Sequence, residues 1–244
     1  MELATLFRLI IVRISALFYS VKRSKVIFYH DLHSDFRYTD MSTPIKLFRN
    51  HIKIIQESGY DIVSEITNDY GQIEICFDDA FLGLYENIDF IKKHSIPIHL
   101  FVVPSYVNKK NYINSEQLLE MGKSRLIKIS SHTYSHKLLN RITDKEVYRE
   151  LEMSKEYLEN LLCRQIDSIC FPEGKFNHSI IHIAEEVGYK KQYSSIPGFF
   201  FDSFGTNIIK RSLVQFAGEK EFRSILRGGD HILAFWYRIK HYKK

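Results

Sequence analysis

The sequence has few cysteines and no arrangement of them that would hold a small secreted fold together. Only Cys76, Cys163 and Cys170 occur among 244 residues. An odd number of cysteines without regular spacing does not indicate a disulfide framework. Cys76 and Cys170 lie in apolar segments, where a free thiol packs as a small hydrophobic group. We therefore expect a reducing compartment, the cytoplasm, for this chain.

A strong excess of one charge is also missing. The formal net charge is +5, from 34 basic and 29 acidic residues. The chain has no run of lysines and arginines long enough to indicate binding to a phosphate backbone. We expect no nucleic-acid partner.

Long hydrophobic runs are absent as well. Uninterrupted apolar stretches such as residues 9–12 are far shorter than the roughly 20 residues that span a bilayer. No small-residue cleavage site follows the first apolar segment, which argues against a secretory signal. The sequence thus predicts neither a spanning helix nor a cleaved leader.

The two ends of the chain combine apolar and basic residues. In residues 1–25, apolar side chains recur at helical spacing, and Arg8 and Arg13 lie among them. This pattern predicts an amphipathic helix that lies either on an anionic membrane surface or against the domain. Residues 217–244 form a basic, aromatic tail that suits a membrane interface or packing on the domain. Peripheral contact with the inner face of a membrane is therefore an expectation, and the oligomeric state stays open.

No linker rich in proline, glycine or serine divides the rest of the chain, and no repeat is present. Apolar strand-like segments alternate with helical patterns throughout residues 26–216, and one of the predicted helices covers residues 85–94. Two of the helices have start signals, a capping box at Thr143–Glu146 and a hydroxyl and proline at 42–44. Repeated strand–helix units predict one α/β domain around a parallel sheet, open or closed into a barrel.

Polar side chains follow several of the predicted strands. The pairs Asp78/Asp79 and His132/His136 come after apolar segments, as do Glu173 and His30. Because the carboxyl ends of parallel strands meet at one edge, we expect these residues to share a site. Two imidazoles and a carboxylate suit a catalytic metal with an open position for water. Zinc is the default, other transition metals also fit, and the second carboxylate is placed to take a proton.

With these motifs in order, the sequence resembles the polysaccharide deacetylase family (NodB-type, carbohydrate esterase family 4). The family's first motif, Thr-Phe-Asp-Asp-Gly, reads Cys76-Phe77-Asp78-Asp79-Ala80 here. The second, His-Ser/Thr-x-x-His, reads His132-Thr133-Tyr134-Ser135-His136. The third, which ends in Pro-Tyr-Gly, reads Pro172-Glu173-Gly174. The resemblance runs from about His30 to Val214.

The resemblance implies a distorted (β/α) barrel, usually of seven strands. It also implies metal-dependent removal of an acetyl group from a saccharide, such as a surface polysaccharide or its precursor. Asp79, His132 and His136 would bind the metal, most often zinc, and Asp78 would be the general base. The backbone N–H of Glu173 would help to form the oxyanion hole, and Arg211 would orient Asp78.

Several positions depart from the family pattern. Ala80 replaces a glycine, which is compatible with a negative φ. Glu173 replaces a tyrosine and must turn its carboxylate away from a developing oxyanion. Cys170 stands where many members have an arginine. The family's late motif with a catalytic histidine is matched only by Ile232–Trp236, which contains none.

The general acid is therefore open among three histidines: His30, His33 and His231. We prefer His30, because it ends a strand, although a supporting role for it is an equal alternative. Two other functions also stay open. A glycan-binding protein without activity is motivated by Glu173 and the missing histidine motif, and a deformylase of a lipid-linked amino sugar would use the same chemistry.

Overall fold

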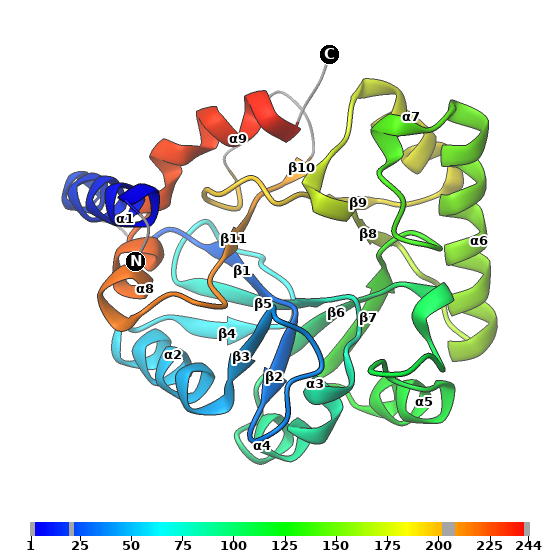
Figure 1. Cartoon of the computed structure of the whole chain (residues 1–244), viewed down its shortest axis with the longest axis horizontal. Coiled ribbons are helices and arrows are strands. Elements are labelled where there is room, and N and C mark those ends of the chain that lie inside the picture. Colours follow the sequence, from blue (N-terminus) through cyan, green and yellow to red (C-terminus); the bar gives the residue numbers. More distant parts are fainter. Residues whose placement is uncertain (1–2, 20–21, 202–207, 242–244) are drawn as a thin grey trace.

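The computed structural model describes residues 3–19, 22–201 and 208–241 (Figure 1). The last three residues of the predicted basic tail lie outside this part of the chain. The side chains at 3–6 and 238–241 are likewise not described. Among the described residues, no helix is both long and apolar enough to cross a membrane.

Strands and helices alternate along most of the chain. The strands are β1 (Lys25–Tyr29), β2 (Asp31–His33), β3 (Ser42–Pro44), β4 (Asp61–Val63), β5 (Gln72–Asp78), β6 (Ile98–Val102), β7 (Ile127–Ser131), β8 (Ser168–Cys170), β9 (Lys191–Tyr193), β10 (Ile208–Ile209) and β11 (Arg211–Leu213). The α-helices are α1 (Leu3–Ser15), α2 (Ile45–Glu57), α3 (Leu82–Glu86), α4 (Ile88–Lys93), α5 (Ser115–Lys123), α6 (Asp144–Leu162), α7 (His178–Val187), α8 (Glu219–Leu226) and α9 (Ala234–His241).

The main sheet is parallel and curls on itself. Its order is β10-β9-β8-β7-β6-β5-β1-β11, and β4 pairs with the first residues of β5. No ladder joins β10 to β11 in the described residues, but only Lys210 separates them in the chain. The two ends of the strand order therefore meet through a single interrupted strand. Counting β10 and β11 as one, and β4 as an addition, gives the seven positions of the expected distorted barrel, so the predicted fold class is confirmed.

Both faces of the strands are covered, which explains why they read as continuous apolar runs. Successive side chains of a strand point to opposite faces. On β1, Ile27 and Tyr29 belong to the large core beneath the helices, whereas Val26 and Phe28 belong to a smaller core inside the barrel. The interior core also contains Phe101 and Tyr193. The barrel is thus filled by side chains, and its site must lie at a rim.

Two local predictions need correction. Residues 42–44 form β3, paired with β2, and helix α2 follows with Pro44 at its N-cap and no side-chain cap. The Thr43 hydroxyl instead donates to the carbonyl oxygen of Gln215 at 3.0 Å. The single helix expected at 85–94 is two short helices, α3 and α4, that meet at Asn87. The capping box of α6 is confirmed, with the Thr143 side chain accepting from the Glu146 N–H.

His51 on α2 is a buried histidine outside the predicted site. Its Nδ1 bonds the Tyr29 hydroxyl at 2.9 Å, and its Nε2 lies 2.7 Å from the carbonyl oxygen of Ala217. The ring stacks on Phe222 with centroids 3.8 Å apart. These contacts hold a neutral imidazole, and burial lowers the pKa of His51 to about 4.

Because His51 is buried in its neutral form, we expect the protein to lose folding stability as the pH falls. The unfolded state has a pKa near 6.5 at this position, so it takes up a proton first as the pH falls. Above about pH 6.5 the buried neutral His51 contributes its full share to the free energy of unfolding. Between about pH 6.5 and pH 4 the protein loses this contribution progressively, a total of roughly 3 kcal/mol. Urea unfolding of wild type and His51→Gln across this range measures it. The variant should be less stable at pH 7 and show a shallower pH slope, and parallel slopes would contradict the assignment.

Candidate active site

The carboxyl end of β5 sends two adjacent carboxylates in different directions. Asp78 is the last residue of the strand, and the chain then turns through the left-handed region, with φ of 70° at Asp79 and 61° at Ala80. A negative φ was the condition under which alanine would replace glycine here without strain, and that condition is not met. The methyl group is buried, which contributes about 0.8 kcal/mol and offsets part of the roughly 1–2 kcal/mol cost of this conformation. This balance explains how alanine stands at a position that favours glycine.

Asp78 forms a two-pronged ion pair with Arg211. The Arg211 Nη1 and Nη2 atoms donate to the two carboxylate oxygens, each at 2.7 Å. Both side chains are buried. Burial by itself would raise the pKa of Asp78, but the charge and hydrogen bonds of Arg211 outweigh it and hold that pKa well below its usual range. Asp78 is consequently ionised and fixed in orientation by Arg211, and its role as general base stays a prediction.

Arg211 is itself held from several sides. Its Nε donates to the Ser194 carbonyl oxygen at 2.9 Å, and Nη2 also lies 2.8 Å from the Cys170 sulfur. The guanidinium lies over the rings of Phe28 and Phe101, 4.3 and 5.2 Å from their centroids. The cysteine at 170 thus occupies space beside Arg211 and serves as its acceptor.

Asp79 faces the two histidines of the second motif. Its Oδ1 lies 3.7 Å from the His132 Nε2 and 3.5 Å from the His136 Nε2. The three groups form a cluster whose ligand atoms lie within 4.8 Å of one another. Two atoms bound to a tetrahedral zinc at about 2.0–2.1 Å lie roughly 3.4 Å apart. The observed spacings therefore match a shared metal ion.

Protonation and hydrogen bonding favour the same conclusion. Nδ1 of His132 bonds the carbonyl oxygen of Cys170 at 2.8 Å, which leaves Nε2 as the unprotonated nitrogen. Burial lowers the pKa of His132 to about 3 and also lowers that of His136. Burial raises the pKa of Asp79 to about 7, and its Oδ1 has no hydrogen-bond partner among the described residues. A buried carboxylate oxygen without a donor, between two neutral imidazoles, fits a cation site.

His136 is placed by an unusual loop. Both Thr133 and His136 have positive φ, 63° and 60°, a conformation that persists only where surroundings enforce it. The His136 N–H donates to the Thr133 hydroxyl at 3.2 Å. The neighbouring Ser135 bonds Glu150 of α6 through both its N–H and its hydroxyl. Helix α6 therefore anchors the loop that presents the second histidine.

Glu173 lies at the same rim with its carboxylate turned outward. That carboxylate pairs with the Lys175 ammonium at 3.0 Å and is 54% exposed, which meets the requirement that it point away. The Lys175 hydrogen bond lowers the pKa of Glu173. Gly174 must be glycine, because its φ is 64° and a Cβ there would lie 2.6 Å from the Ser195 nitrogen. The backbone of this turn is thus rigidly defined, although the oxyanion role of the Glu173 N–H stays a prediction.

The three histidines considered as the general acid lie in different parts of the structure. His30 lies close enough to act on the pKa of both Asp78 and Asp79, in each case downward against the effect of burial, and its Nδ1 bonds the Gln215 Oε1 at 2.6 Å. His33 bonds the Ser42 hydroxyl on the β2–β3 segment. His231 stacks with Phe199, whose ring lies near Lys25 at the amino end of β1. Of the three, the structure brings only His30 to the cluster.

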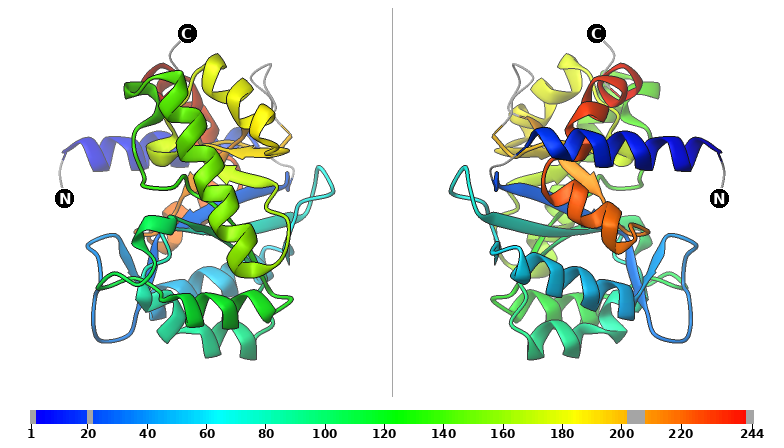
Figure 2. Two further views of the ribbon diagram at one scale, coloured as in Figure 1. Left: turned by 90° about the vertical axis from the view of Figure 1, so that its right-hand side faces the viewer. Right: turned by 90° about the vertical axis from the view of Figure 1, so that its left-hand side faces the viewer.

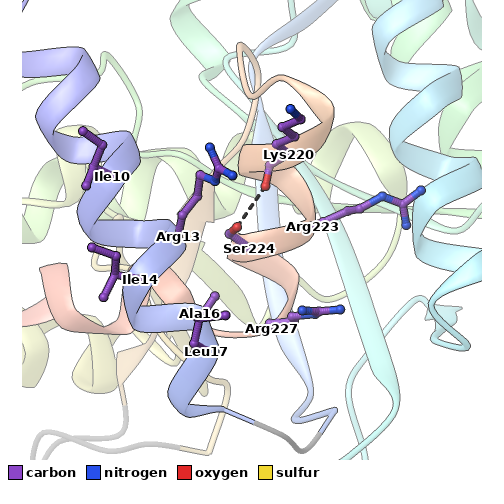
Figure 3. A pocket seen from close by; sticks show the side chains of 9 residues that line it. All are labelled: Ile10, Arg13, Ile14, Ala16, Leu17, Lys220, Arg223, Ser224 and Arg227. Carbon is purple, nitrogen blue, oxygen red and sulfur yellow. Dashed lines mark hydrogen bonds between the residues drawn. The ribbon is translucent and has the colours of Figure 1, made fainter.

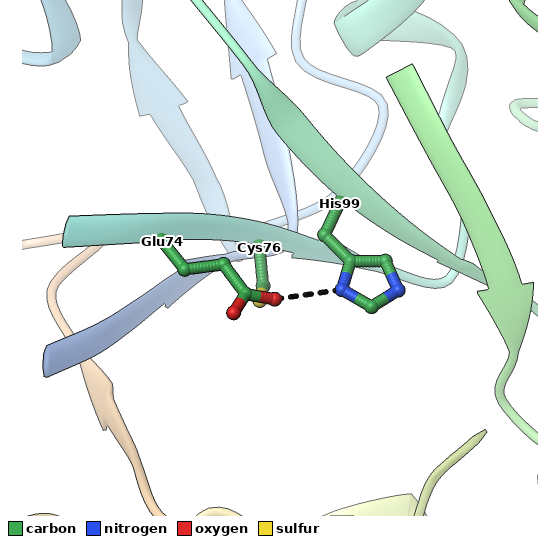
Figure 4. Close-up of side chains that lie close together, drawn as sticks. All are labelled: Glu74, Cys76 and His99. Atoms are coloured by element: carbon green, nitrogen blue, oxygen red, sulfur yellow. Dashed lines mark hydrogen bonds and ion pairs between the residues drawn. The ribbon is translucent and has the colours of Figure 1, made fainter. Parts of the chain in front are cut away.

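A second polar cluster lies inside the barrel (Figure 4). Glu74, Cys76 and Asp78 share the inward face of β5, because they alternate along the strand. Glu74 Oε1 bonds His99 Nδ1 at 2.8 Å, and His99 Nε2 bonds the Ser130 hydroxyl at 2.7 Å. All of these side chains are buried. The network joins β5, β6 and β7 beneath the site, and we infer that it stabilises the strands that carry the site residues.

The sequence missed three kinds of site residue. Gln215 and the sulfur of Cys170 hold His30 and Arg211, and neither lies in a motif that names such a role. Tyr106 and Tyr112 lie in loops above the rim, with their rings tilted against each other and their centroids 4.7 Å apart. Tyr106 also lies against His136, at 6.3 Å between centroids. Loop aromatics carry no periodic signal, so only the structure reveals them.

Comparisons with known proteins agree with this geometry. A family model described as polysaccharide deacetylase matches residues 66–191, just over half of the chain. YxkH of Bacillus subtilis, a candidate polysaccharide deacetylase, is 27% identical over 184 residues, which cover 71% of this chain and 64% of that protein. The poly-β-1,6-N-acetyl-D-glucosamine N-deacetylase of Staphylococcus aureus is 27% identical over 134 residues, or 49% of this chain and 46% of that protein. The matches thus span less than two thirds of these relatives.

Solved structures show the same fold. The deacetylase PplD of Streptococcus pyogenes, in complex with acetate, aligns with a TM-score of 0.72 at 18% identity, covering 83% of this chain and 97% of that one. IcaB from Ammonifex degensii aligns with a TM-score of 0.72 at 16% identity, covering 86% and 97%. From its fold, the order of its motifs and the family match, this chain belongs to the polysaccharide deacetylase family.

Proposed function

We propose that the protein hydrolyses acetyl groups from an acetylated saccharide, with an N-acetylglucosamine polymer as the first substrate class to test. This proposal rests on one observation: two groups of catalytic-type residues lie side by side at the same rim of the barrel. Asp79, His132 and His136 form a three-ligand group, and the Asp78–Arg211 pair lies beside it. The named substrate of the Staphylococcus aureus relative supports the choice of polymer.

The residues divide the chemistry between them. A divalent transition metal, zinc by preference, held by Asp79, His132 and His136 would supply Lewis acidity and lower the pKa of water. Asp78, ionised and fixed by Arg211, accepts the proton of the attacking water. The Glu173 backbone N–H donates to the oxyanion that develops on the acetyl carbonyl. His30, positioned by Gln215, donates a proton to the leaving nitrogen or oxygen and is then reloaded by the proton that Asp78 took from water.

Aromatic rings at the rim suit a sugar polymer. The Tyr106 and Tyr112 rings meet at a tilt, with centroids 4.7 Å apart, and Phe81 stacks on Tyr112 with centroids 4.6 Å apart. Flat ring faces beside a polar site bind the apolar faces of a ligand while its hydroxyls stay hydrated. The contact of Tyr106 with His136 places this platform at the metal group.

The test is product analysis with defined substrates. Metal-reconstituted protein is incubated with N-acetylated and O-acetylated oligosaccharides, including β-1,6-linked N-acetylglucosamine, and acetate is measured enzymatically. Acetate release from any of them supports the proposal. Formate release from an N-formylated amino sugar, with no acetate from the other substrates, would replace it with the deformylase. Saccharide binding without any acyl release would replace it with the binding protein.

A further inference from the structure

Helix α1 turns its apolar stripe toward solvent. At about 3.6 residues per turn, four large apolar residues fall on one side of α1 and the short helix after it. These are Phe7, Ile10, Ile14 and Leu17, whose exposed fractions run from 46% for Ile10 to 77% for Leu17. The opposite side carries Val12 and Ala16, which are buried. The hydrophobic face of this helix is therefore not the face that packs on the domain.

Contacts on the other side hold α1 in place without the stripe. A Cβ on Gly229 would lie 2.1 Å from the Val12 carbonyl oxygen, so the helix packs directly against a glycine backbone. Arg8 Nη1 pairs with Glu221 Oε1 of α8 at 2.7 Å. Docking on the domain and exposure of an apolar stripe thus occur on opposite sides of one helix.

Exposed apolar side chains also lie on the last helix and the turn before it. Residues 229–233 contact both α1 and α9, and the two helices lie on the same side of the molecule in both views (Figures 1 and 2). This segment adds three exposed side chains, Ile232, Phe235 and Trp236, with Trp236 74% exposed. We call the seven residues Phe7, Ile10, Ile14, Leu17, Ile232, Phe235 and Trp236 the α1–α9 face.

A basic groove borders this face (Figure 3). It runs between α1 and α8, with Ile10, Ile14 and Leu17 on one wall. Four cations also line it: Arg13, Lys220, Arg223 and Arg227. Arg223 pairs with Glu57 and Glu219, and no carboxylate is among the described residues that line the groove. Apolar side chains thus lie directly beside positive charge.

We propose that the α1–α9 face docks on an anionic lipid bilayer, with its apolar side chains at the acyl boundary and the groove cations at lipid phosphates. Apolar residues flanked by Arg and Lys are typical of helices that lie in the interface plane, and tryptophan favours the headgroup level. A second copy of the chain fits poorly, because an isologous contact would bring the same face, and so the same cations, together.

The amino end of α1 projects on the side of the β2–β3 segment (Figure 2). Docking would therefore place the edge of the site rim near the membrane.

The chain carries its own probe for this surface. Trp236 is the single tryptophan of the sequence and lies on the proposed face. Adding vesicles of phosphatidylcholine mixed with phosphatidylglycerol should shift its emission to shorter wavelength. Vesicles of phosphatidylcholine alone should bind at least roughly 10-fold more weakly, because each cation contributes about 1 kcal/mol at an anionic surface.

Two variants at exposed positions separate the parts of the surface. Ile14→Ser/Leu17→Ser should weaken partitioning roughly 30-fold through lost apolar burial. Arg13→Gln/Arg227→Gln should weaken it roughly 30-fold, on anionic vesicles alone. Tyr148→Ser, at a half-exposed position of α6 across the molecule, is the matched control and should bind as wild type does. All three are first checked for an unchanged thermal midpoint.

Three outcomes would overturn the proposal. The first is an unchanged Trp236 emission when anionic vesicles are added to the wild-type protein. The second is undiminished partitioning of both double variants. The third is a concentration-dependent dimer in sedimentation that Ile14→Ser/Leu17→Ser dissociates, which would make a second copy the occupant. Because none of these measurements uses turnover, the result is independent of the proposed deacetylase activity.

Discussion

Asp78→Asn is expected to reduce acetate release roughly 1,000-fold while the metal content stays unchanged. An amide has no basic oxygen to take the proton from water, and removal of a general base typically costs 100- to 10,000-fold. Asp78 is not part of the group of Asp79, His132 and His136, although it also lies near His132 and Cys170. Turnover and metal content of the same preparation are measured side by side.

Glu74→Gln is the matched control for this substitution. Glu74 is also a buried carboxylate on the inward face of β5, but it bonds His99 rather than Arg211. The control removes a charge from the same strand and should lose less than about 10-fold in activity, since Glu74 lies beneath the site. Full activity of Asp78→Asn would show that another group takes the proton. An equal loss in both variants would show a general effect of disturbing β5.

Arg211→Met is expected to cost roughly 3–5 kcal/mol of unfolding free energy and most of the activity. The substitution leaves the Asp78 carboxylate buried without a counter-charge, and breaking one side of a buried pair has about this cost. The pKa of Asp78 should rise as a result, because burial then loses its main opposing interaction. Urea unfolding gives the stability change, and acetate release gives the activity.

A double-mutant cycle isolates the Asp78–Arg211 interaction from packing. Arg211→Met combined with Asp78→Asn removes both charges, so the double variant should be more stable than the sum of the single losses predicts. We expect a coupling of about 2 kcal/mol, within the range for residues in direct contact. Additivity within about 0.5 kcal/mol would contradict a strong buried pair.

The metal group and Asp78 were predictable because strand ends in a parallel sheet converge. Apolar runs located β5 and β7, so Asp79, His132 and His136 had to approach one another at the same rim. The partner of Asp78 was less accessible, since Arg211 lies 133 residues away and only the family resemblance suggested it. The left-handed backbone at Ala80 could not be foreseen, because nothing in the sequence reports the balance between a buried methyl and backbone strain.

Other features depended on tertiary contacts. A hydrophobic period identified α1 as amphipathic, but the period does not say which side faces the domain. Gly229 and Glu221 decide that, and both lie more than 200 residues further along the chain. The sequence favoured His30 because it ends a strand, but only the fold shows that His231 lies elsewhere, against Phe199 near the amino end of β1.

The central claim is that Asp79, His132 and His136 hold one catalytic metal ion, and metal content tests it most directly. Purified protein is reconstituted with zinc, cleared of excess metal and analysed by mass spectrometry beside His132→Ala. The control is His182→Ala, a surface histidine of α7 that is 72% exposed. We expect about one equivalent in wild type and His182→Ala and a large loss in His132→Ala. No bound metal in wild type, or equal content in all three proteins, would contradict the account.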